Sequence, residues 1–432
     1  MIDSVNKLSD ASDPAVSGSR DRIGIYISSV ESARGAEQVA ALLAKGFSDK
    51  QYKVDFLVED EAGWLLEHLR QYSPNIRVIN LNEPGFMHSC EPWFRRYAIL
   101  RLVLGMFFNW PYRVTCPLRL VKVLRHKKPP IFALSSYVKA SRPDAVISLL
   151  NMPNTALLLA RCVRRMNTRL IVSIHNTMSA EVSLENTSSK WKRNLPFLMR
   201  CLCPRADAVV AVSGGVADDL KNAIGLPGSN IEVVYNPVIR PEIVSLSEEA
   251  VDHPWLIEKS CPVLVAASKL KPQKDLQMLL RAFALVRKKR RVRLIILGEG
   301  PEGEALQQLA NELEIAEDID LAGFIQNPFA FYSRADLFVL SSAWEGLPTA
   351  LIEAMGCGCP VVSTDCPSGP QEILEGGRYG TLVQVGDQQA MAEAIEANLD
   401  SPPLRTQLLE RAACFSIDKS VANYEALVRK AG

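Results

Sequence analysis

Two glutamates, Glu345 and Glu353, flank a Gly/Pro turn in the most chemically informative stretch of the chain. The turn, Gly346-Leu347-Pro348-Thr349, follows an apolar run, and Pro348 is typical of the first turn of a helix. A helix that begins just beyond a strand presents free backbone N–H groups to an anionic ligand. Carboxylates for hydroxyl groups and N–H groups for a phosphate together predict a sugar-nucleotide site.

The same two carboxylates could instead be the acid and nucleophile of a glycosidase. On one helix, eight residues at a rise of ~1.5 Å would place them ~12 Å apart along the axis. Retaining hydrolases need ~5–5.5 Å between the two carboxyl groups, and inverting hydrolases need ~6.5–9.5 Å. The spacing therefore disfavours hydrolysis and favours one carboxylate on a sugar and the other on a ribose.

A lysine-rich loop at residues 268–275 would supply the matching positive charge. It follows the apolar run 263–267, and open α/β sheets bind ligands just past the carboxyl ends of their strands. Lys269 and Lys274 could converge there on a diphosphate and neutralise a departing phosphate. Exposed loop lysines are more often merely solvated charges, but their place beside the glutamate motif favours a role in binding.

Gly298 and His175 also follow predicted strands. The Gly298-Glu299-Gly300 turn allows a close backbone approach, but Pro301 departs from the fingerprint of nucleotide-dependent dehydrogenases, so we predict a structural turn near the nucleotide. A lone histidine after a strand is more often a structural group. In a crevice built from the carboxyl ends of strands, His175 would instead face a ligand.

Apolar runs that alternate with helix-length segments predict the scaffold for these groups. Strands are predicted at 22–28, 53–58, 76–79, 145–150, 170–174 and 208–212, and again at 263–267, 293–297, 319–322, 336–340, 360–363 and 381–383. Such alternation favours parallel sheets covered on both faces. Between the two series, prolines and a polar run indicate an interdomain connection. The predicted fold class is α/β, with two doubly wound Rossmann-like domains that face each other across a crevice.

Composition excludes several classes of protein. Lys+Arg 49 against Asp+Glu 48 leaves almost no net charge, so a general role with nucleic acid has no electrostatic support. The ten cysteines lack the usual zinc spacing, which predicts reduced thiols and no metal site. No apolar run of about 18 residues predicts a spanning helix. We expect the protein in the cytoplasm, at the inner face of the cytoplasmic membrane.

Residues 92–130 differ from the rest of the chain in their charge. The segment carries arginines and lysines interleaved with aromatic and aliphatic residues, and it contains no Asp or Glu after Pro92. A basic, aromatic-rich amphipathic stretch suits an anionic membrane surface. The alternative is a pair of core-packed helices with a solvated basic face. We favour peripheral membrane contact.

Taken together, these motifs resemble the retaining group 1 glycosyltransferases of family four, which have the GT-B fold. The Glu345…Glu353 pair is similar to the family's E-x7-E motif, and residues 335–342 and 345–348 are similar to its most recognisable block. The resemblance is strongest from residue 263 to residue 374. It implies a nucleotide-sugar donor as a substrate, with no metal and no other cofactor.

The resemblance also implies a role for each site residue. Lys269 and Lys274 would bind the diphosphate. Glu345, together with the backbone N–H groups of residues 346–349, would hold the donor sugar and the distal phosphate. Glu353 would accept hydrogen bonds from the ribose. The remaining assignments are Gly35 and Glu37 in the N-terminal loop near the phosphates, Gly298 near the nucleotide, and His175 beside the transferred sugar. Leaving-group charge would be stabilised by the lysines and the helix dipole, with retention at the sugar.

Two departures from the family pattern weaken parts of this assignment. The N-terminal loop reads Arg34-Gly35-Ala36-Glu37, where a second glycine is common, so Arg34 either crowds the donor or binds it. Lys269 stands where an arginine is usual, which removes the bidentate fork but keeps the charge.

The resemblance predicts the following domain order: a disordered lead-in at 1–20, an acceptor-side domain at 21–240, a linker at 241–261, a nucleotide-sugar domain at 262–415, and a final helix at 416–432 that packs back on the first domain. The predicted function is transfer of a sugar from a UDP- or GDP-linked donor to a glycan or lipid-linked glycan in bacterial surface-polysaccharide biosynthesis, such as lipopolysaccharide or exopolysaccharide. The alternatives are an epimerase on the same fold and a catalytically silent nucleotide-sugar-binding protein.

Overall fold

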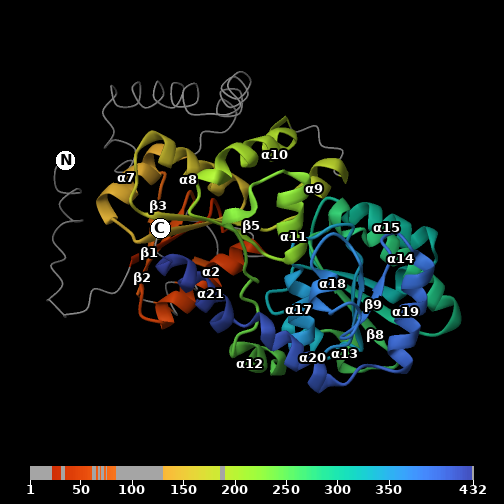
Figure 1. The fold of residues 1–432 in the computed structure, drawn as a ribbon. Helices are drawn as coiled ribbons and strands as arrows, with labels where there is room; N and C mark the ends of the chain where they lie inside the picture. Colours follow the sequence, from red (N-terminus) through yellow and green to blue (C-terminus); the bar gives the residue numbers. More distant parts are fainter. Residues whose placement is uncertain are drawn as a thin grey trace.

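The structure is a computed structural model that describes residues 22–30, 35–60, 75–83, 130–184 and 190–430, together with Leu65, Leu66, Leu69 and Ser73. Two parallel β-sheets occupy the two ends of the molecule, and helices connect successive strands (Figure 1). The predicted α/β class with two doubly wound domains is confirmed. The predicted lead-in at 1–20 and the basic segment at 92–130, apart from Pro130, lie outside the described residues.

The N-terminal domain contains a seven-stranded sheet in the order β3-β2-β1-β4-β5-β6-β7, and all neighbouring strands are parallel. Its strands are β1 (Arg22–Tyr26), β2 (Lys53–Val58), β3 (Ile76–Asn80), β4 (Ala145–Leu149), β5 (Arg169–Ile174), β6 (Ala208–Ala211) and β7 (Ile231–Val233). Its helices are α2 (Ala36–Asp49), α7 (Ile131–Ser141), α8 (Asn151–Val163), α9 (Met178–Leu184), α10 (Lys190–Leu202) and α11 (Gly214–Asp218).

The C-terminal domain contains a six-stranded parallel sheet in the order β10-β9-β8-β11-β12-β13. Its strands are β8 (Val263–Ala267), β9 (Arg293–Leu297), β10 (Ile319–Gly323), β11 (Leu337–Leu340), β12 (Val361–Thr364) and β13 (Thr381–Val383). Its helices are α14 (Leu276–Lys289), α15 (Gly303–Glu312), α16 (Phe329–Tyr332), α17 (Thr349–Gly356), α18 (Pro370–Ile373), α19 (Gln388–Asp400) and α20 (Arg405–Ala412).

The twelve strands predicted from apolar runs are all present, and most of their bounds agree within two residues. Several short elements were not predicted, among them one strand and the two helices of the interdomain connection. The edge strand β7 has only three residues, and the connection between the domains contains two short helices, α12 (Glu242–Glu248) and α13 (Pro254–Ile257). Prolines border or begin both helices, and this feature made the segment resemble an irregular linker.

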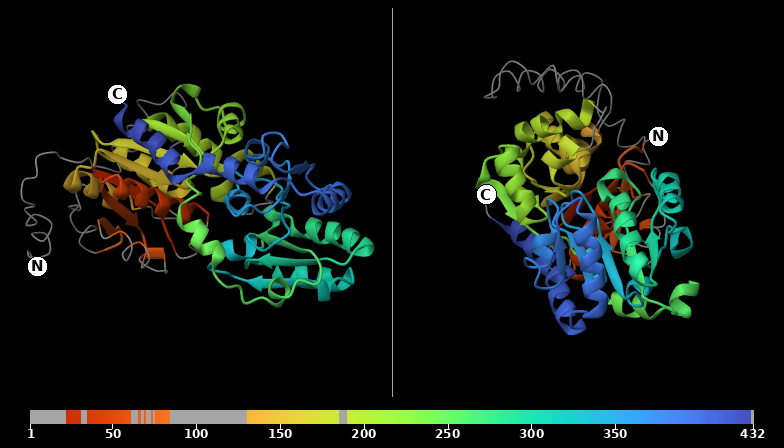
Figure 2. Two further views of the ribbon diagram at one scale, coloured as in Figure 1. Left: turned by 90° about the horizontal axis from the view of Figure 1, so that it is seen from below. Right: turned by 90° about the vertical axis from the view of Figure 1, so that its right-hand side faces the viewer.

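The final helix, α21 (Ile417–Arg429), returns to the N-terminal domain and lies against α2 (Figures 1 and 2). The two helices approach closely at Gly46, where an added Cβ would meet Val421 at 2.5 Å and Ile417 at 2.7 Å. The Glu425 carboxylate accepts hydrogen bonds from Lys50 Nζ and Tyr52 Oη, both at 2.7 Å. The chain therefore crosses between the domains twice, once after β7 and once before α21.

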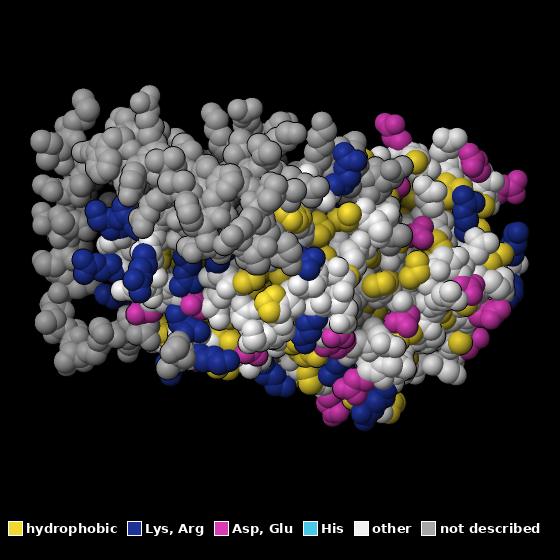
Figure 3. All heavy atoms as spheres, turned by 45° about the horizontal axis from the view of Figure 1, so that its top comes forward, with side chains coloured by type: hydrophobic (Ala, Val, Ile, Leu, Met, Phe, Trp, Pro, Cys, Tyr) yellow, Lys and Arg dark blue, Asp and Glu magenta, His cyan; other side chains and the backbone are white. Residues whose placement is uncertain are grey.

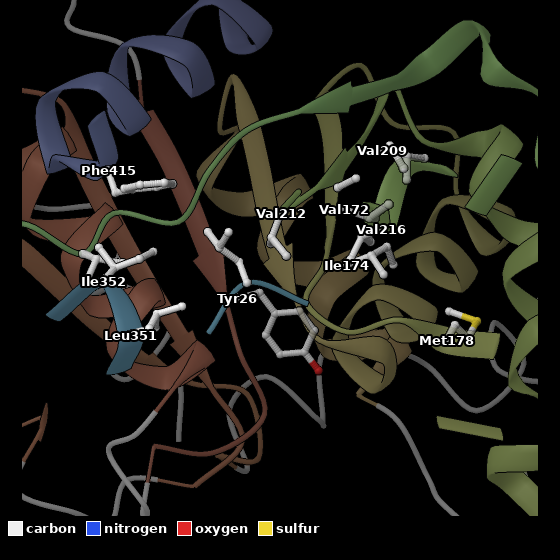
Figure 4. Close-up of a cluster of buried hydrophobic side chains, with 14 of the residues drawn as sticks. Tyr26, Val172, Ile174, Met178, Val209, Val212, Val216, Leu351, Ile352 and Phe415 are labelled. Atoms are coloured by element: carbon white, nitrogen blue, oxygen red, sulfur yellow. The ribbon is translucent and has the colours of Figure 1, made fainter. Parts of the chain in front are cut away.

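The largest hydrophobic cluster extends through both domains. It joins strand residues of the N-terminal sheet, such as Val172 and Val209, to Leu351 and Ile352 of α17 and to Phe415 before α21 (Figure 4). Each sheet has a further cluster on its other face. Within the described ranges, no helix is long and apolar enough to cross a membrane, and every cysteine is a free thiol.

A buried carboxylate ties together the amino-terminal edge of the first sheet. Asp55 of β2 is 1% exposed and accepts two hydrogen bonds from Arg77 at 2.9 Å, two from Arg22 at 3.2 Å, and one from Tyr137 Oη at 2.8 Å. Burial and the nearby Asp55 charge raise the pKa of Tyr137 well above its usual value, so the phenol stays a donor. This network connects β1, β2, β3 and α7.

We expect Asp55→Ala to lower the free energy of unfolding by roughly 3 kcal/mol, because it leaves two guanidinium groups and a buried phenol without their acceptor. Denaturant titration at neutral pH measures the change. Asp49→Ala is the matched control: Asp49 pairs with Lys45 on the exposed surface of α2, and such pairs contribute about 0–1 kcal/mol. Equal losses in the two variants would contradict the assignment.

Candidate active site

The candidate site lies where the strand order of the C-terminal sheet changes direction. β8 has β9 on one side and β11 on the other, so the loops after β8 and β11 open on the same crevice at the carboxyl ends of the strands. These two loops carry the lysines and the first glutamate that the sequence singled out. The second glutamate lies on α17, which follows the β11 loop.

An ion pair joins the two loops. Lys274 Nζ lies 2.5 Å from Glu345 Oε1, and the same oxygen accepts a hydrogen bond from Ser342 Oγ at 2.7 Å. Both charged side chains are largely buried, at 17% and 9% exposure. The structure therefore brings together the cation and the carboxylate that were predicted to bind opposite parts of one donor.

Side chains at the strand ends hold the loops in this position. Ser341 Oγ donates to the Lys274 carbonyl at 2.7 Å, and Gln273 Nε2 donates to the Trp344 carbonyl at 2.7 Å. A backbone hydrogen bond from Ala343 N to the Gln273 carbonyl at 2.8 Å completes the connection. Lys274 ends a short 3-10 helix, Pro272–Lys274, in which the proline restricts the backbone of the loop.

The amino terminus of α17 faces the same place without a capping side chain. Within the described residues, the backbone N–H groups of Gly346, Leu347 and Thr349 donate no hydrogen bond, and Pro348 has no N–H. Free N–H groups and the helix dipole favour an anion. The positive charge of Lys274 lies in the adjoining loop, so the geometry suits a phosphate.

Glu353 differs from Glu345 in its surroundings. It is 9% exposed, and within the described part of the chain its carboxylate makes no hydrogen bond or ion pair. Burial raises its pKa, while the positive charge of Arg240 acts in the opposite direction. Arg240 belongs to the interdomain connection, and its guanidinium lies 4.9 Å from the centre of the Phe329 ring. The carboxylate of Glu353 thus retains acceptor positions for a ligand.

Lys269 and Gly298 belong to two neighbouring loops, those after β8 and β9. Lys269 is exposed, and no ion pair to it is found among the described residues. Gly298 has φ +146°, and an added Cβ would lie 1.8 Å from the Ser268 carbonyl oxygen. Gly298 therefore lets the 298–300 turn pack directly on the lysine loop, which agrees with the predicted structural turn.

The N-terminal domain closes the crevice through His175. An added Cβ on Gly346 would lie 2.2 Å from the His175 carbonyl oxygen, so the two domains touch at the glutamate turn. The imidazole Nε2 is buried and has no hydrogen-bond partner among the described residues. Burial lowers the pKa of His175 to about 4, which keeps the ring neutral near pH 7. A neutral imidazole can exchange a hydrogen bond with a sugar hydroxyl.

The N-terminal loop is only partly described. Gly35 precedes α2 with φ +55°, a conformation that favours glycine, and nothing lies within 4 Å of an added Cβ. Glu37 lies in the first turn of α2. Arg34 lies outside the described residues, so its predicted effect on the donor stays a prediction.

Sequence reasoning missed several polar residues that surround the glutamate turn. Ser341 and Ser342 follow β11 directly, and three more hydroxyl groups, those of Thr177, Ser213 and Ser368, lie at the domain contact. All of them come within four residues of a strand end. That position was the signal that could have identified them, but serine and threonine are too common in loops for the signal to stand alone.

Two family models match consecutive parts of the chain. One is described as Glycosyltransferase Family 4 and matches residues 33–239, and the other is described as Glycosyl transferases group 1 and matches residues 248–414. The first range covers most of the N-terminal sheet, and the second contains the whole C-terminal sheet. The Lys274–Glu345 pair lies within the second match.

Named relatives and a solved structure agree with these models. An N-acetylgalactosamine-N,N'-diacetylbacillosaminyl-diphospho-undecaprenol 4-alpha-N-acetylgalactosaminyltransferase from Campylobacter jejuni is 30% identical over 286 residues, which is 66% of this chain and 75% of that protein. The lipopolysaccharide core biosynthesis glycosyltransferase LpsE from Rhizobium meliloti is 30% identical over 205 residues, which is 48% of this chain and 57% of that protein. The crystal structure of Anabaena HepE in complex with UDP and glucose has a TM-score of 0.66 at 19% identity, and the match covers 94% of this chain and 97% of that one.

The low pKa of His175 predicts a pH dependence of stability. Between about pH 6.5 and pH 4 the unfolded chain binds a proton at this residue and the folded chain does not, so stability falls as the pH drops. We expect this residue to account for a loss of roughly 2 kcal/mol between pH 8 and pH 5. Denaturant titrations at both pH values should show that loss in the wild type and a correspondingly smaller one in His175→Gln. The same pH dependence in both proteins would contradict the prediction.

Proposed function

The chain belongs to the group 1 glycosyltransferases of family four, which have the GT-B fold, and on that premise we propose that it transfers a hexose, with retention, from a UDP- or GDP-linked donor to a lipid-linked glycan during assembly of a bacterial surface polysaccharide. The observation that carries the proposal is the Lys274–Glu345 pair beside the uncapped amino terminus of α17. A donor diphosphate needs positive charge and N–H groups, and its sugar needs acceptors for hydroxyl hydrogens. Both are present within one crevice.

In this proposal each end of the donor has its own group. Lys274, Lys269 and the N–H groups of residues 346–349 bind the diphosphate, while the Glu345 carboxylate accepts hydrogen bonds from the sugar. Glu353 accepts from the ribose hydroxyls, and His175 meets the sugar from the N-terminal domain. Gly35 and Glu37 approach the phosphates across the crevice, and Gly298 shapes the turn near the nucleotide.

The chemistry depends on stabilising the departing diphosphate. The bond between the anomeric carbon and the diphosphate oxygen breaks, and the acceptor hydroxyl oxygen bonds to the same face of the sugar. The proton of that hydroxyl passes to the departing diphosphate. Negative charge that grows on the leaving oxygen is stabilised by Lys274, Lys269 and the dipole of α17. Lys274 is held before the reaction by Glu345 and by the contacts of its loop, so little reorganisation is needed at this charge. That the reaction needs no metal stays a prediction.

The acceptor is proposed from the relatives. The C. jejuni relative is named for a diphospho-undecaprenol substrate, and LpsE is named for the lipopolysaccharide core. Both names describe glycans carried on lipids, which supports a lipid-linked acceptor for this chain. The epimerase alternative loses support, because both relatives are named as glycosyltransferases. A silent binding protein would be expected to have lost charged groups of the site, yet both lysines and both glutamates are present.

We also propose peripheral contact with an anionic membrane surface. Apart from Pro130, the basic segment 92–130 lies outside the described residues, but the helices α7, α8 and α10 of the same domain carry Lys or Arg and no Asp or Glu. On the face shown in Figure 3, Lys and Arg side chains gather at one end of the molecule, and Asp and Glu side chains are more frequent at the other end. In the N-terminal domain the exposed basic residues include Lys139, Arg142, Arg165, Arg193 and Arg200.

Removal of either member of the central pair tests the proposed function. We expect Lys274→Gln and Glu345→Gln each to lower kcat about 100-fold, because each removes a group that acts on the donor. The assay follows nucleotide release from a panel of UDP- and GDP-hexoses and product formation on a lipid-linked acceptor. Lys259→Gln, which breaks an ion pair with Asp336 outside the crevice, is the control and should keep wild-type turnover. Undiminished turnover in both site variants would refute the site, and nucleotide binding without transfer would favour the silent binder.

Vesicle flotation tests the membrane contact. We expect the wild type to float with phosphatidylglycerol vesicles and not with phosphatidylcholine vesicles. A variant with Arg95, Arg96 and Arg101 changed to Gln should bind at least about tenfold more weakly, since each basic residue contributes about 1 kcal/mol near such a surface. Changing Lys288, Lys289 and Arg378 of the C-terminal domain to Gln removes the same charge and serves as the control. Equal binding by the two variants would contradict the proposal.

A further inference from the structure

Three hydroxyl groups from different loops converge behind the glutamate turn. They form the hydroxyl cluster of Thr177, Ser213 and Ser368, with exposures of 4%, 0% and 9%. Thr177 follows β5 and Ser213 follows β6, so both belong to the N-terminal domain, whereas Ser368 follows β12 in the C-terminal domain. Ser368 Oγ lies 3.1 Å from Thr177 Oγ1 and 3.2 Å from Ser213 Oγ, so the cluster bridges the two domains.

The cluster is attached to the backbone of the donor loop. The Glu345 carbonyl accepts hydrogen bonds from Thr177 Oγ1 at 2.6 Å and from Thr177 N at 3.1 Å. The Gly346 carbonyl accepts from Ser213 Oγ at 2.8 Å. Ser368 of the C-terminal domain also donates to these two carbonyls, from its N to Glu345 at 3.2 Å and from its Oγ to Gly346 at 3.3 Å. Two successive carbonyls are therefore held by groups of both domains, and the shorter hydrogen bonds come from the N-terminal domain.

A planar trans peptide bond converts this contact into a constraint on the opposite side of the chain. In each peptide unit the C=O and the N–H point in opposite directions. The Glu345 carbonyl shares its unit with the Gly346 N–H, and the Gly346 carbonyl shares its unit with the Leu347 N–H. Hydrogen bonds that fix the two carbonyls therefore also fix the direction of these two N–H groups. A carbonyl that accepts a hydrogen bond also makes the N–H of its own unit a stronger donor.

We propose that Thr177 and Ser213 are positioning residues: by holding the carbonyls of Glu345 and Gly346, the N-terminal domain aims the Gly346 and Leu347 N–H groups at the donor phosphate. This inference rests on the proposed function, because it assigns those N–H groups to a nucleotide sugar. The hydrogen bonds from Thr177 and Ser213 form only when the two domains are in contact. The direction of the two N–H groups, and with it turnover, thereby depends on closure of the crevice.

Neighbouring contacts show that this interface is built for close approach. The Gly214 N–H donates to both oxygens of the Glu372 carboxylate, at 3.1 and 2.8 Å, and Tyr235 Oη donates to Glu372 Oε1 at 2.7 Å. An added Cβ on Gly215 would lie 2.4 Å from the Ser368 side chain. Glu372 is thus paired with groups of the other domain, and the backbone at Gly215 has no room for a larger residue.

Loss of the hydroxyl group alone tests the inference. Thr177→Val keeps the shape of the side chain but removes the donor, and we expect kcat on a UDP-hexose to fall about tenfold, while UDP itself binds within about threefold of wild type. Thr177→Ser restores the hydroxyl and should keep most of the turnover. Thr168→Val is the matched control. The buried Thr168 Oγ1 also donates to a backbone carbonyl, that of Pro143, but at the amino-terminal ends of the strands, away from the donor loop.

A second measurement needs no donor. Hydrogen exchange of peptides that cover residues 341–350 should accelerate in the Thr177→Val/Ser213→Ala variant and stay unchanged in Thr168→Val. The inference would be overturned if exchange and kcat in the Thr177 and Ser213 variants matched those of the wild type. It would also be overturned if Thr177→Ser turned over as slowly as Thr177→Val, because the packing of the side chain would then explain the effect. A wild-type protein that turns over no nucleotide sugar would refute the proposed function, and accelerated exchange in the double variant alone would still support the positioning contact.

Discussion

The buried carboxylate of Glu345 is the constraint around which the crevice is arranged. An ionised carboxylate removed from water is costly unless charge and hydrogen bonds compensate it, and here Lys274 and Ser342 do so. Because Lys274 and Glu345 belong to different loops, the pair requires the loops after β8 and β11 to keep a fixed distance. Ser341 and Gln273 hold that distance through the backbone, independently of the charges. The positive charge of the site is therefore placed by the same contacts that hold the Glu345 carboxylate.

The sequence predicted the parts of the fold that follow from burial. Strands covered on both faces are continuous apolar runs, so the twelve strands long enough to show such a run were recognised. Lys274 and Glu345, which follow two of those strands, were expected in one crevice, and the structure brings them into contact. The strand β7 and the helices α12 and α13 were missed because they are short, and short elements gain their stability from tertiary packing that no local pattern displays. The contact between Thr177 and Glu345 was equally hidden, since it joins residues 168 positions apart through a backbone carbonyl, a group that every residue has.

Glycine at position 346 answers two requirements at once. The sequence suggested only that the turn should leave backbone N–H groups open to a ligand. The structure adds that the His175 carbonyl of the other domain comes so close that any side chain at 346 would collide with it. The glutamate turn is therefore in contact with the N-terminal domain on one side and open to an anion on the other. A substitution at this position would change the domain contact and the anion site together, and the two effects could not be separated by mutating the glycine alone.

The two glutamates of the motif are chemically identical but electrostatically different, and this difference separates their roles. The Oε1 atom of Glu345 already has two donors, whereas the nearest described positive charge acting on Glu353 is that of Arg240, which lies beyond ion-pair distance. Arg240 belongs to the connection between the domains and lies over the Phe329 ring. When the Gln38 amide of α2 is oriented with its oxygen toward the guanidinium, that oxygen accepts hydrogen bonds from Arg240 at 3.3 Å. The field on Glu353 therefore depends on how the connection is folded. Closure of the domains can influence both ends of a bound donor, through carbonyls at the Glu345 end and through charge at the Glu353 end.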